Sequence, residues 1–356
     1  MHRKVDVKKI LFISEALSAP FDEGIKNVAF SLYNSLKIKK DALSITKEGN
    51  NTAHLEISKV CLNKLFLNKN LGKLIKNYLP DVIIYLPEAS ITFNSFVRAK
   101  VLKLMCSQSR VLVLGVKHIE YSAIQKMIIA KFLTPDYLML LGSFEMEFFL
   151  NAGLKVKVLP PAVKSSKFYQ ATKEEKEKLR SEFNIPNNRT VVLHVGHVRS
   201  TRNVECLLEV QKIDDVQVVI VGSTSTVVEK DLKDRLANKD IRIMDDYIAD
   251  ISNIYKMSDI YVFPVFNKIA CIDMPLSILE AMACNLPVIT TRFGALPEYF
   301  KEDDGFRYFD GVEELVELIK LSKDMDGREV HNNKKVEPFT WDRFTDEVIA
   351  ACNEIS

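Results

Sequence analysis

The chain of 356 residues is long enough for two domains of ordinary size, each with a hydrophobic core of its own. Its 47% hydrophobic and 27% charged residues are typical of a soluble globular protein. No apolar run approaches the roughly 20 residues that span a bilayer, so a transmembrane protein is excluded as a class.

The net charge of +2 hides an asymmetry along the chain. Residues 1–160 carry 23 Lys and Arg against 13 Asp and Glu, whereas the remaining residues carry 26 against 34. A basic first half suits an anionic partner such as a membrane surface, a lipid phosphate or a nucleotide sugar. Surface charging for solubility explains the same asymmetry equally well.

Cysteine and histidine show no metal-binding spacing, and we predict no structural metal. The six cysteines are scattered in apolar surroundings, which favours free thiols in a reducing compartment over disulfides. The apolar run Ile10–Ile13 is too short for a signal-peptide core, so we expect a cytoplasmic protein. The cysteines are Cys61, Cys106, Cys206, Cys271, Cys284 and Cys352.

Strands and helices alternate through the first half. Ile10–Ser14 is predicted as a strand and Gly24–Leu36 as a helix, because its apolar residues recur at helical spacing. Leu62–Tyr78 is predicted as an amphipathic helix with an outward lysine face. Further strands are expected at Val82–Leu86, Val111–Gly115 and Tyr137–Leu141. Repeated units of this kind predict a parallel sheet with right-handed crossovers.

The paired prolines Pro160-Pro161 interrupt this pattern, because neither a helix nor a central strand continues through them. A charged helix over Thr172–Glu182 follows, and the alternation then restarts. Strands are predicted at Val191–Val195, Val216–Val221, Ile241–Met244, Ile260–Phe263 and Val288–Thr291, and a last helix at Trp341–Ser356. The predicted fold is α/β, with two doubly wound domains facing a cleft: residues 1–160, residues 161–338, and a final helix within 339–356.

Residues suited to a ligand follow several predicted strands. In the first half these are Gly24, where the backbone can approach a ligand at a helix start, and His118 just past a strand. A lone histidine serves as often in a structural role as in a catalytic one. The absence of any GxGxxG motif argues against a nicotinamide or flavin enzyme.

In the second half, Gly196 is followed by Arg199 and Arg202, and Gly222 ends the next strand. The planar guanidinium groups of the two arginines suit the oxygens of a diphosphate. The alternative is that both are ordinary surface arginines. In PLSILEAMACNLPVITTRFGALPE (275–298), the helix start at Leu276 and Ser277 points backbone N–H groups toward an anion. Glu280 on that helix could accept hydrogen bonds from two ribose hydroxyls.

Three segments together resemble the retaining GT-B glycosyltransferases of family 4, the glycosyl transferases group 1. They are VLHVGHVRSTRNVECLLE (192–209), YIADISNIYKMSDIYVFPV (247–265) and the 275–298 segment. The resemblance is specific over roughly Pro160–Asp310 and rests on layout alone over residues 8–158. It implies two Rossmann-like domains, a nucleotide sugar bound mainly by the second, acceptor recognition by the first, and a final helix that crosses back to the first.

The resemblance also implies roles for single residues. Glu280 matches the acid on the donor ribose, Arg202 the basic residue on the diphosphate, His118 the histidine near the reacting sugar, and Gly24 the glycine loop by the phosphates. Two departures stand out. Ile272 occupies the position of the family's first acid, and Asp273 is next to it. His197 occupies the position of the family's first arginine, for which the nearby Arg199 is the expected substitute.

We therefore expect a hexosyltransferase that moves a sugar from a UDP- or GDP-sugar to a hydroxyl acceptor, with retention and without metal. His118, Arg202 and Asp273 are the expected catalytic residues. Gly24, Gly196, Arg199, Arg202, Gly222, Leu276, Ser277 and Glu280 are expected to bind the donor, with no further cofactor. A glycan or lipid-linked acceptor, peripheral contact with an anionic membrane and no nucleic acid are expected as partners. An inactive GT-B protein that binds nucleotide or glycan is the alternative, as is a different enzyme with a phosphorylated ligand.

Overall fold

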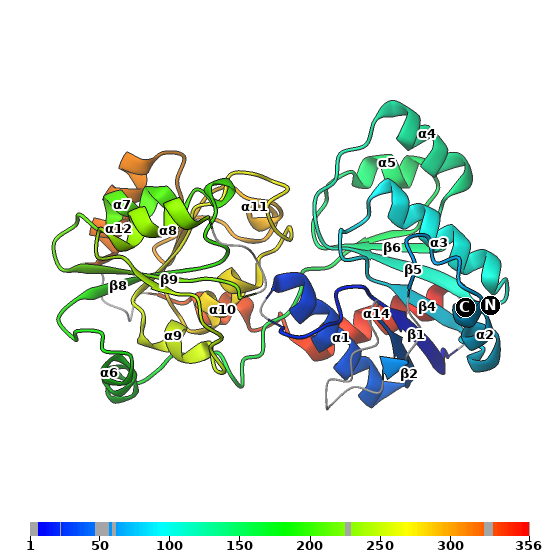
Figure 1. Cartoon of the computed structure of the whole chain (residues 1–356), viewed down its shortest axis with the longest axis horizontal. Coiled ribbons are helices and arrows are strands. Elements are labelled where there is room, and N and C mark those ends of the chain that lie inside the picture. Colours follow the sequence, from blue (N-terminus) through cyan, green and yellow to red (C-terminus); the bar gives the residue numbers. More distant parts are fainter. Residues whose placement is uncertain are drawn as a thin grey trace. The chain divides into compact units, whose positions relative to one another are not determined.

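The computed structural model describes residues 6–21, 23–46, 57–58, 62–224, 229–323 and 330–355, so the predicted free thiol of Cys61 lies outside the described residues. The chain divides into two compact units. Unit 1 comprises residues 1–161 together with 341–356, and unit 2 comprises residues 162–340. Each unit is built around one parallel sheet (Figure 1).

Unit 1 contains a seven-stranded sheet in the order β3-β2-β1-β4-β5-β6-β7, and all its described strand pairs are parallel. The predicted strands at 10–14, 82–86, 111–115 and 137–141 are confirmed as β1, β4, β5 and β6. Three further strands were not predicted, because each is short and lacks a sustained apolar run. The strands are β1 Lys9–Ile13, β2 Asp41–Ile45, β3 Ile57–Ser58, β4 Val82–Tyr85, β5 Arg110–Gly115, β6 Tyr137–Leu140 and β7 Val156–Val158.

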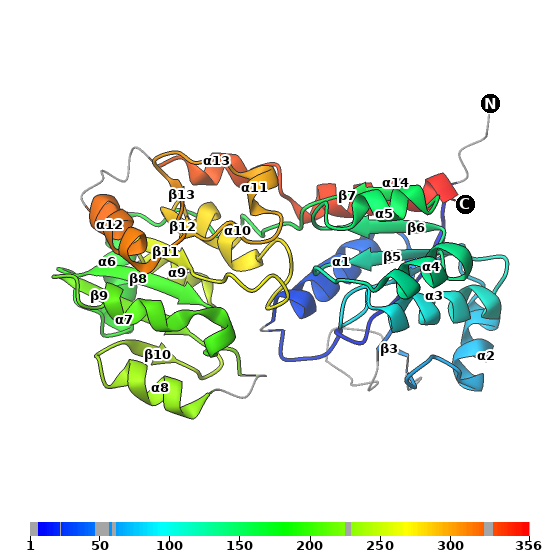
Figure 2. The same ribbon diagram turned by 90° about the horizontal axis from the view of Figure 1, so that it is seen from above.

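Helices cover both faces of this sheet (Figure 2). Apolar residues of α2, α3, α4 and α5 pack with alternate strand residues into one continuous core. On the other face, α14 packs against α1 and β5. The helices are α1 Gly24–Lys39, α2 Lys69–Tyr78, α3 Phe93–Met105, α4 Ala123–Phe132, α5 Met146–Asn151 and α14 Trp341–Ile355.

The predicted start of the lysine-rich helix at Leu62 is wrong. Phe66 has a positive φ of 61°, which an α-helix does not contain. The side chain of Asn68 then accepts a hydrogen bond from the N–H of Asn70 at 2.8 Å, which caps a helix that begins at Lys69. The helix therefore covers only the second part of the predicted range.

Helix α14 is the second piece of chain in unit 1. Its inward face buries Phe344, Val348 and Cys352. Outside that face, Lys39 of α1 lies 2.9 Å from Asp342 and 2.7 Å from Asp346. The helix is thus held by a buried apolar stripe with exposed ion pairs at its edge, of which the stripe contributes more because exposed pairs are screened.

Unit 2 contains a six-stranded parallel sheet in the order β10-β9-β8-β11-β12-β13. The strands are β8 Thr190–Val195, β9 Val216–Val221, β10 Arg242–Met244, β11 Ile260–Phe263, β12 Val288–Thr290 and β13 Phe306–Tyr308. The helices are α6 Lys173–Glu182, η1 Ser200–Arg202, η2 Val204–Cys206, α7 Leu207–Val210, α8 Lys230–Ala237, α9 Ser252–Met257, α10 Leu276–Ala283, α11 Leu296–Tyr299, α12 Val312–Lys323 and α13 Asn332–Val336, where η denotes a 3₁₀ helix.

Helices α7, α8 and α12 pack on one face of this sheet, and α10 contacts β11 and β12. The strands β8, β9 and β11 supply alternating Val and Ile to the core, as expected for a sheet that is covered on both faces. The α/β class and the two Rossmann-like units predicted from the alternation are confirmed.

Candidate functional site

The predicted donor-binding residues of unit 2 gather at one edge of its sheet. Gly196 follows β8, Gly222 follows β9, and the segment after β11 leads into α10. Since the strands are parallel, all their carboxyl ends lie at the same edge, which is where open α/β sheets bind ligands. This carboxyl edge of unit 2 is the candidate site.

The two glycines continue the sheet where the strands end. The N–H of Gly196 donates to Val221 O at 2.9 Å, and that of Gly222 donates to Met244 O at 2.8 Å. A Cβ at Gly196 would lie 3.0 Å from Nε2 of His194, so a side chain there would press on the histidine. The absence of a side chain at Gly196 therefore leaves room for the imidazole of His194 at the end of β8.

His194 is a site residue that the sequence reasoning missed. Its side chain is fully buried, and its Nδ1 lies 3.0 Å from the carbonyl oxygen of Val262. The carbonyl can only accept, so Nδ1 carries the proton and donates. Burial lowers the pKa of His194 to about 4 against the opposing effect of the Val262 hydrogen bond, with smaller lowering contributions from Arg202 and His197, and the imidazole is neutral at physiological pH. The available signal was a polar residue inside the apolar strand VVLHV.

Arg202 lies in η1 with only 8% of its surface exposed. Its backbone N–H donates to Arg199 O at 2.9 Å, but its guanidinium makes no hydrogen bond or ion pair with any residue in the described ranges. Arg199, three residues earlier, is half-buried. Glu229 accepts from the N–H of Ser200 at 3.1 Å and from its hydroxyl at 3.2 Å, which fixes the loop that carries both arginines.

The arginines lie at an irregular turn and not at the start of a regular helix. After Arg199 the chain forms two 3₁₀ turns before the four-residue α7. Arg202 lies in the first of these turns, and its positive charge lowers the pKa of His194 on β8.

Glu280 lies on α10 at the same edge and contacts a buried tyrosine. The hydroxyl of Tyr255 donates to Oε2 of Glu280 at 2.8 Å. Burial raises the pKa of Glu280 to about 7, although the Tyr255 hydrogen bond and the charge of Lys167 oppose this rise. The pKa of Tyr255 is raised well above its ordinary value, chiefly by burial and then by the charge of Glu280, so the phenol keeps its proton.

A second buried tyrosine joins the start of α10 to the end of β8. The hydroxyl of Tyr261 lies 3.4 Å from Val195 O and hydrogen-bonds with the side chain of Ser277. Ser277 therefore lies beside the strand end that leads to Gly196, with buried Leu276 directly before it. Sequence reasoning could not find either tyrosine, because each acts through a contact far along the chain.

Asp273 is 2% exposed and lies just before α10, next to the buried Ile272. Its carbonyl oxygen accepts a hydrogen bond from the N–H of Ala295 at 2.9 Å. Gly294 approaches the same carbonyl so closely that a Cβ would lie 2.2 Å from the oxygen. The segment before α10 is thus held by the turn after β12.

The other two predicted residues, Gly24 and His118, belong to unit 1. Gly24 is the first residue of α1. His118 follows β5, with its ring edge-on to Phe144 at 5.5 Å between centroids and its Nε2 3.8 Å from Glu120 Oε1. It lines a hollow of about 480 Å³ that Lys126 of α4 and several residues of α5 also line. The structure therefore brings the predicted residues together in two groups, one in each unit.

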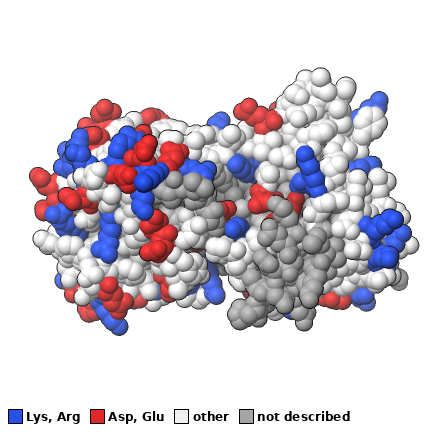
Figure 3. Space-filling view, in the orientation of Figure 1, with Lys and Arg blue, Asp and Glu red and all other residues white. Residues whose placement is uncertain are grey.

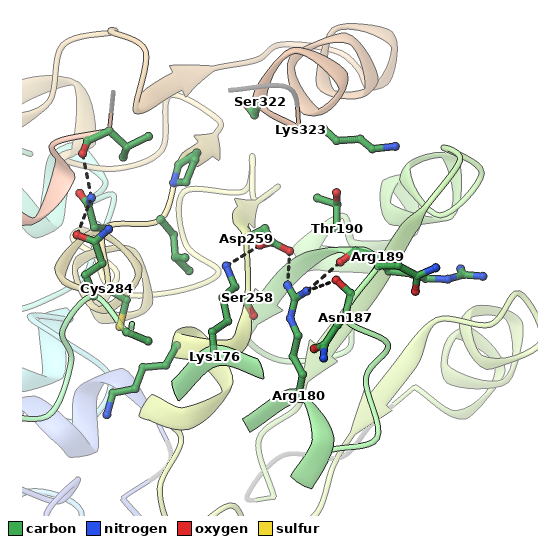
Figure 4. Close-up of a pocket in the computed structure, with 18 residues that line it drawn as sticks. Lys176, Arg180, Asn187, Arg189, Thr190, Ser258, Asp259, Cys284, Ser322 and Lys323 are labelled. Atoms are coloured by element: carbon green, nitrogen blue, oxygen red, sulfur yellow. Dashed lines mark hydrogen bonds and ion pairs between the residues drawn. The ribbon is translucent and has the colours of Figure 1, made fainter. Parts of the chain in front are cut away.

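A second hollow, of about 440 Å³, lies at the opposite edge of the unit 2 sheet (Figure 4). None of the predicted site residues lines it. Arg180 there donates to the carbonyl oxygens of Met257 (2.9 Å), Asn187 (3.2 Å) and Arg189 (3.2 Å), and pairs with Asp259. Lys176 pairs with the same carboxylate at 2.5 Å. The basic side chains of this hollow are satisfied internally, and Arg180 fixes α6 to the strand starts.

Neither a metal cluster nor a membrane-spanning helix is found in the part of the chain that the structure describes. Among the described residues, no group of three or more His, Cys, Asp or Glu is arranged to hold a metal ion. The five cysteines within the described ranges are free thiols. In the same ranges, the helices are too short or too polar to cross a membrane.

Two Rossmann-like units with a ligand edge in the second define the GT-B class of fold. A glycosyltransferase from Rickettsia africae shares the fold over 99% of both chains, with a TM-score of 0.78 and 18% identity. HepE of Anabaena, whose structure contains UDP, shares it over 97% of this chain and 100% of that one, with a TM-score of 0.77 and 15% identity.

The family model for glycosyl transferases group 1 matches residues 175–334, which make up most of unit 2. The sulfoquinovosyl transferase SQD2 of Arabidopsis thaliana is 23% identical over 209 residues, covering 56% of this chain and 40% of that protein. The chain thus matches less than half the length of this curated relative. Over most of unit 2 the chain is therefore similar to the glycosyl transferases group 1, in agreement with the resemblance of the sequence motifs.

Proposed function

We propose that the protein is a glycosyltransferase that uses a UDP- or GDP-sugar as donor and a hydroxyl group as acceptor. The observation that carries this proposal is Arg202, a largely buried guanidinium with no anionic partner among the described residues. A buried charge is costly unless it is paired, so the site is preorganised for an anion. The diphosphate of a nucleotide sugar is such an anion, and HepE contains UDP within the same fold.

Glu280 complements this cation at the same edge of the sheet. In our proposal its carboxylate accepts hydrogen bonds from the two ribose hydroxyls, with Tyr255 holding one oxygen in place. Ser277 and Leu276 present the start of α10 to the diphosphate, and Gly196 and Gly222 allow the backbone to approach it. Asp273 takes the position beside the transferred sugar.

The reaction forms a bond between the acceptor oxygen and the anomeric carbon, while the bond from that carbon to the diphosphate oxygen breaks. The nucleoside diphosphate leaves with the bonding electron pair, and the hydroxyl proton passes to its terminal phosphate oxygen. We propose attack from the same face, which retains the anomeric configuration. Arg202 and Arg199 supply the positive charge that stabilises the leaving group, so the proposed mechanism contains no metal ion. Loss of one such charge lowers the rate by about 10²–10³-fold.

Unit 1 supplies the acceptor side in this proposal. His118 lies at the carboxyl edge of its sheet beside a hollow large enough for a sugar or head group, and Gly24 is the first residue of α1. The basic composition of residues 1–160 favours an acceptor on an anionic membrane in the cytoplasm.

An inactive nucleotide-binding protein is the second candidate. The observation that favours it is Ile272, a buried apolar residue at the position where the family resemblance implies an acid. Such a protein would bind the nucleotide without cleaving the donor, and Ile272→Glu would not create turnover.

The test is calorimetric titration with UDP and GDP of the unmodified chain, Arg202→Met and Glu280→Ala. Arg235→Met, which removes an exposed arginine of unit 2, is the matched control. We expect one nucleotide to bind and both site variants to weaken it at least about tenfold, while the control binds normally. Binding of neither nucleotide refutes the proposal.

Incubation of the intact donor sugar with the protein then separates the two candidates. Release of nucleoside diphosphate, unaffected by a metal chelator, supports the metal-independent enzyme. Tight binding without release supports the inactive protein. Proton NMR of the product reports the anomeric configuration.

A further inference from the structure

Helix α4 of unit 1 carries an apolar face that is exposed. Ile124, Met127 and Phe132 are 67%, 62% and 55% exposed, while Ile129 on the other side of the helix is fully buried in the core. At 100° per residue the three exposed side chains fall on one side, together with the partly exposed Ile128. A contiguous apolar face of this kind marks an interaction surface, whereas apolar residues that are exposed singly are ordinary.

The charges on this helix have a single sign. The sequence of α4, AIQKMIIAKF, contains two lysines and no acid. Lys131 lies between the exposed apolar residues on the helical wheel, and its ammonium group is 5.3 Å from the ring centroid of Phe132. Figure 3 shows the surface over α4 as mostly uncharged, in contrast to the mixed charges over unit 2.

The helix also adjoins the hollow that contains His118. Lys126 lines that hollow, lies 2.6 Å from Glu145 at the start of α5, and places its ammonium group 5.2 Å from the Phe148 ring. These contacts fix α4 beside α5 (Figure 1). At 100° per residue, Lys126 falls on the side of α4 opposite the exposed apolar face, so the hollow and that face are separated by the width of one helix.

We propose that the outward face of α4 docks on an anionic lipid bilayer. The apolar side chains enter the boundary between head groups and acyl chains, and Lys131 contacts the anionic head groups. The inference deepens the proposed function, on which its catalytic meaning rests, because it brings the membrane that carries a lipid-linked acceptor to the helix whose other side lines the hollow at His118. It assigns the contact to α4 rather than to the lysine-rich α2, whose apolar residues Leu71 and Ile75 are buried in the core.

The experiment measures co-sedimentation of the full chain with phosphatidylcholine vesicles, with and without about 30% phosphatidylglycerol. The test variant is Ile124→Gln/Met127→Gln/Phe132→Gln, in which glutamine preserves helix propensity. Its matched control is Ile38→Gln/Leu104→Gln, because these two residues of unit 1 are 86% and 72% exposed on other helices.

We expect the unmodified chain to bind the anionic vesicles and the triple variant to bind at least about tenfold more weakly, while the control is unchanged. Lys131→Gln should lower binding to the anionic vesicles by about fivefold, since one lysine near such a surface contributes about 1 kcal/mol. The proposal is wrong if the unmodified chain does not bind the anionic vesicles, or if the triple variant binds them as strongly as the control variant does.

Two further outcomes would assign the face of α4 or the lipid contact differently. If the triple variant changes the protein from dimer to monomer in gel filtration and vesicle binding is absent, the face joins two copies and the proposal is wrong. If charge reversal on α2 abolishes binding while the triple variant binds normally, the contact lies on α2 and the proposal is also wrong. Nucleotide titration uses neither lipid nor acceptor, so failure of the donor site is seen separately.

Discussion

Gly294 offers the sharpest test of how the segment before α10 is held. This glycine has a φ of +53°, and a Cβ built on it would lie 2.2 Å from the carbonyl oxygen of Asp273 and 2.9 Å from its carbonyl carbon. The perturbation is Gly294→Ala. Gly153→Ala is the control, since Gly153 has a φ of +76° with no atom within 4 Å of its Cβ position.

Two costs add at Gly294 and only one applies at Gly153. An L-residue in the left-handed region costs about 1–2 kcal/mol at either site. At Gly294 the Asp273 oxygen must also retreat by about 1 Å, which is an overpacking cost of about 1–3 kcal/mol. The retreat strains the hydrogen bond from Ala295 to the same oxygen. We therefore expect a loss of about 3 kcal/mol for Gly294→Ala and about 1 kcal/mol for Gly153→Ala.

Urea unfolding measures both free energies, with a probe chosen for each unit. The only tryptophan, Trp341, belongs to α14 in unit 1, so its fluorescence follows the Gly153 variant. Far-UV circular dichroism reports the helices and strands of both units, so the part of its transition that tryptophan fluorescence does not share follows the Gly294 variant in unit 2. The linear extrapolation converts each midpoint into a free energy of unfolding. If the two alanine variants lose stability equally, the close approach of Gly294 to Asp273 does not constrain this turn, and the reasoning is refuted.

Three further predictions concern pH, a buried ion pair and thiol reactivity. The pKa of Glu280 is raised from 4.5 to about 7, so between these values the folded state binds a proton that the unfolded chain has released, and stability falls as the pH rises. Glu280→Gln should escape this loss. Urea unfolding should show it to be more stable than the unmodified chain by about 3 kcal/mol at a pH of about 8, and not at a pH of about 4. If the free energies of unfolding of the two proteins change in parallel with pH, the raised pKa is wrong. Arg180→Met should lower the free energy of unfolding by about 3–5 kcal/mol, because it leaves the partly buried carboxylate of Asp259 without its main partner. Arg189→Met, which removes an exposed arginine, should lower it by under about 1 kcal/mol. Equal urea midpoints for the two variants would show that the Arg180 contacts do not stabilise the fold. In a Cys61→Ser background, a thiol reagent should label the half-buried Cys271 first, and labelling of the buried thiols without unfolding would contradict their burial.

The elements with strong apolar periodicity could be predicted from sequence. The strands at Val82, Val111, Val216 and Ile260 and the helix at Gly24 all have continuous apolar runs or helical spacing, and all are present. The start of α2 could not be predicted, because the apolar pattern continues through residues 62–68, whereas the positive φ of Phe66 and the cap at Asn68 set the helix start at Lys69.

The candidate site was predictable where it depends on local sequence. Glycine after a strand, arginine in the following turn and an acid on α10 are all local signals, and in unit 2 the structure places them at one edge. The supporting contacts were not predictable. Tyr255 reaches Glu280 across 25 residues and His194 reaches Val262 across 68, and a single sequence contains no signal for either pair.

Unit 1 is discontinuous, and this has a consequence for how the chain folds as it is made. All of unit 2 is synthesised before residues 341–356 appear, although these residues complete unit 1. Until then, the surface that Phe344, Val348 and Cys352 cover on unit 1 remains uncovered. The second unit therefore has its whole sequence while the first still lacks a helix, so the part synthesised first is the last to be completed.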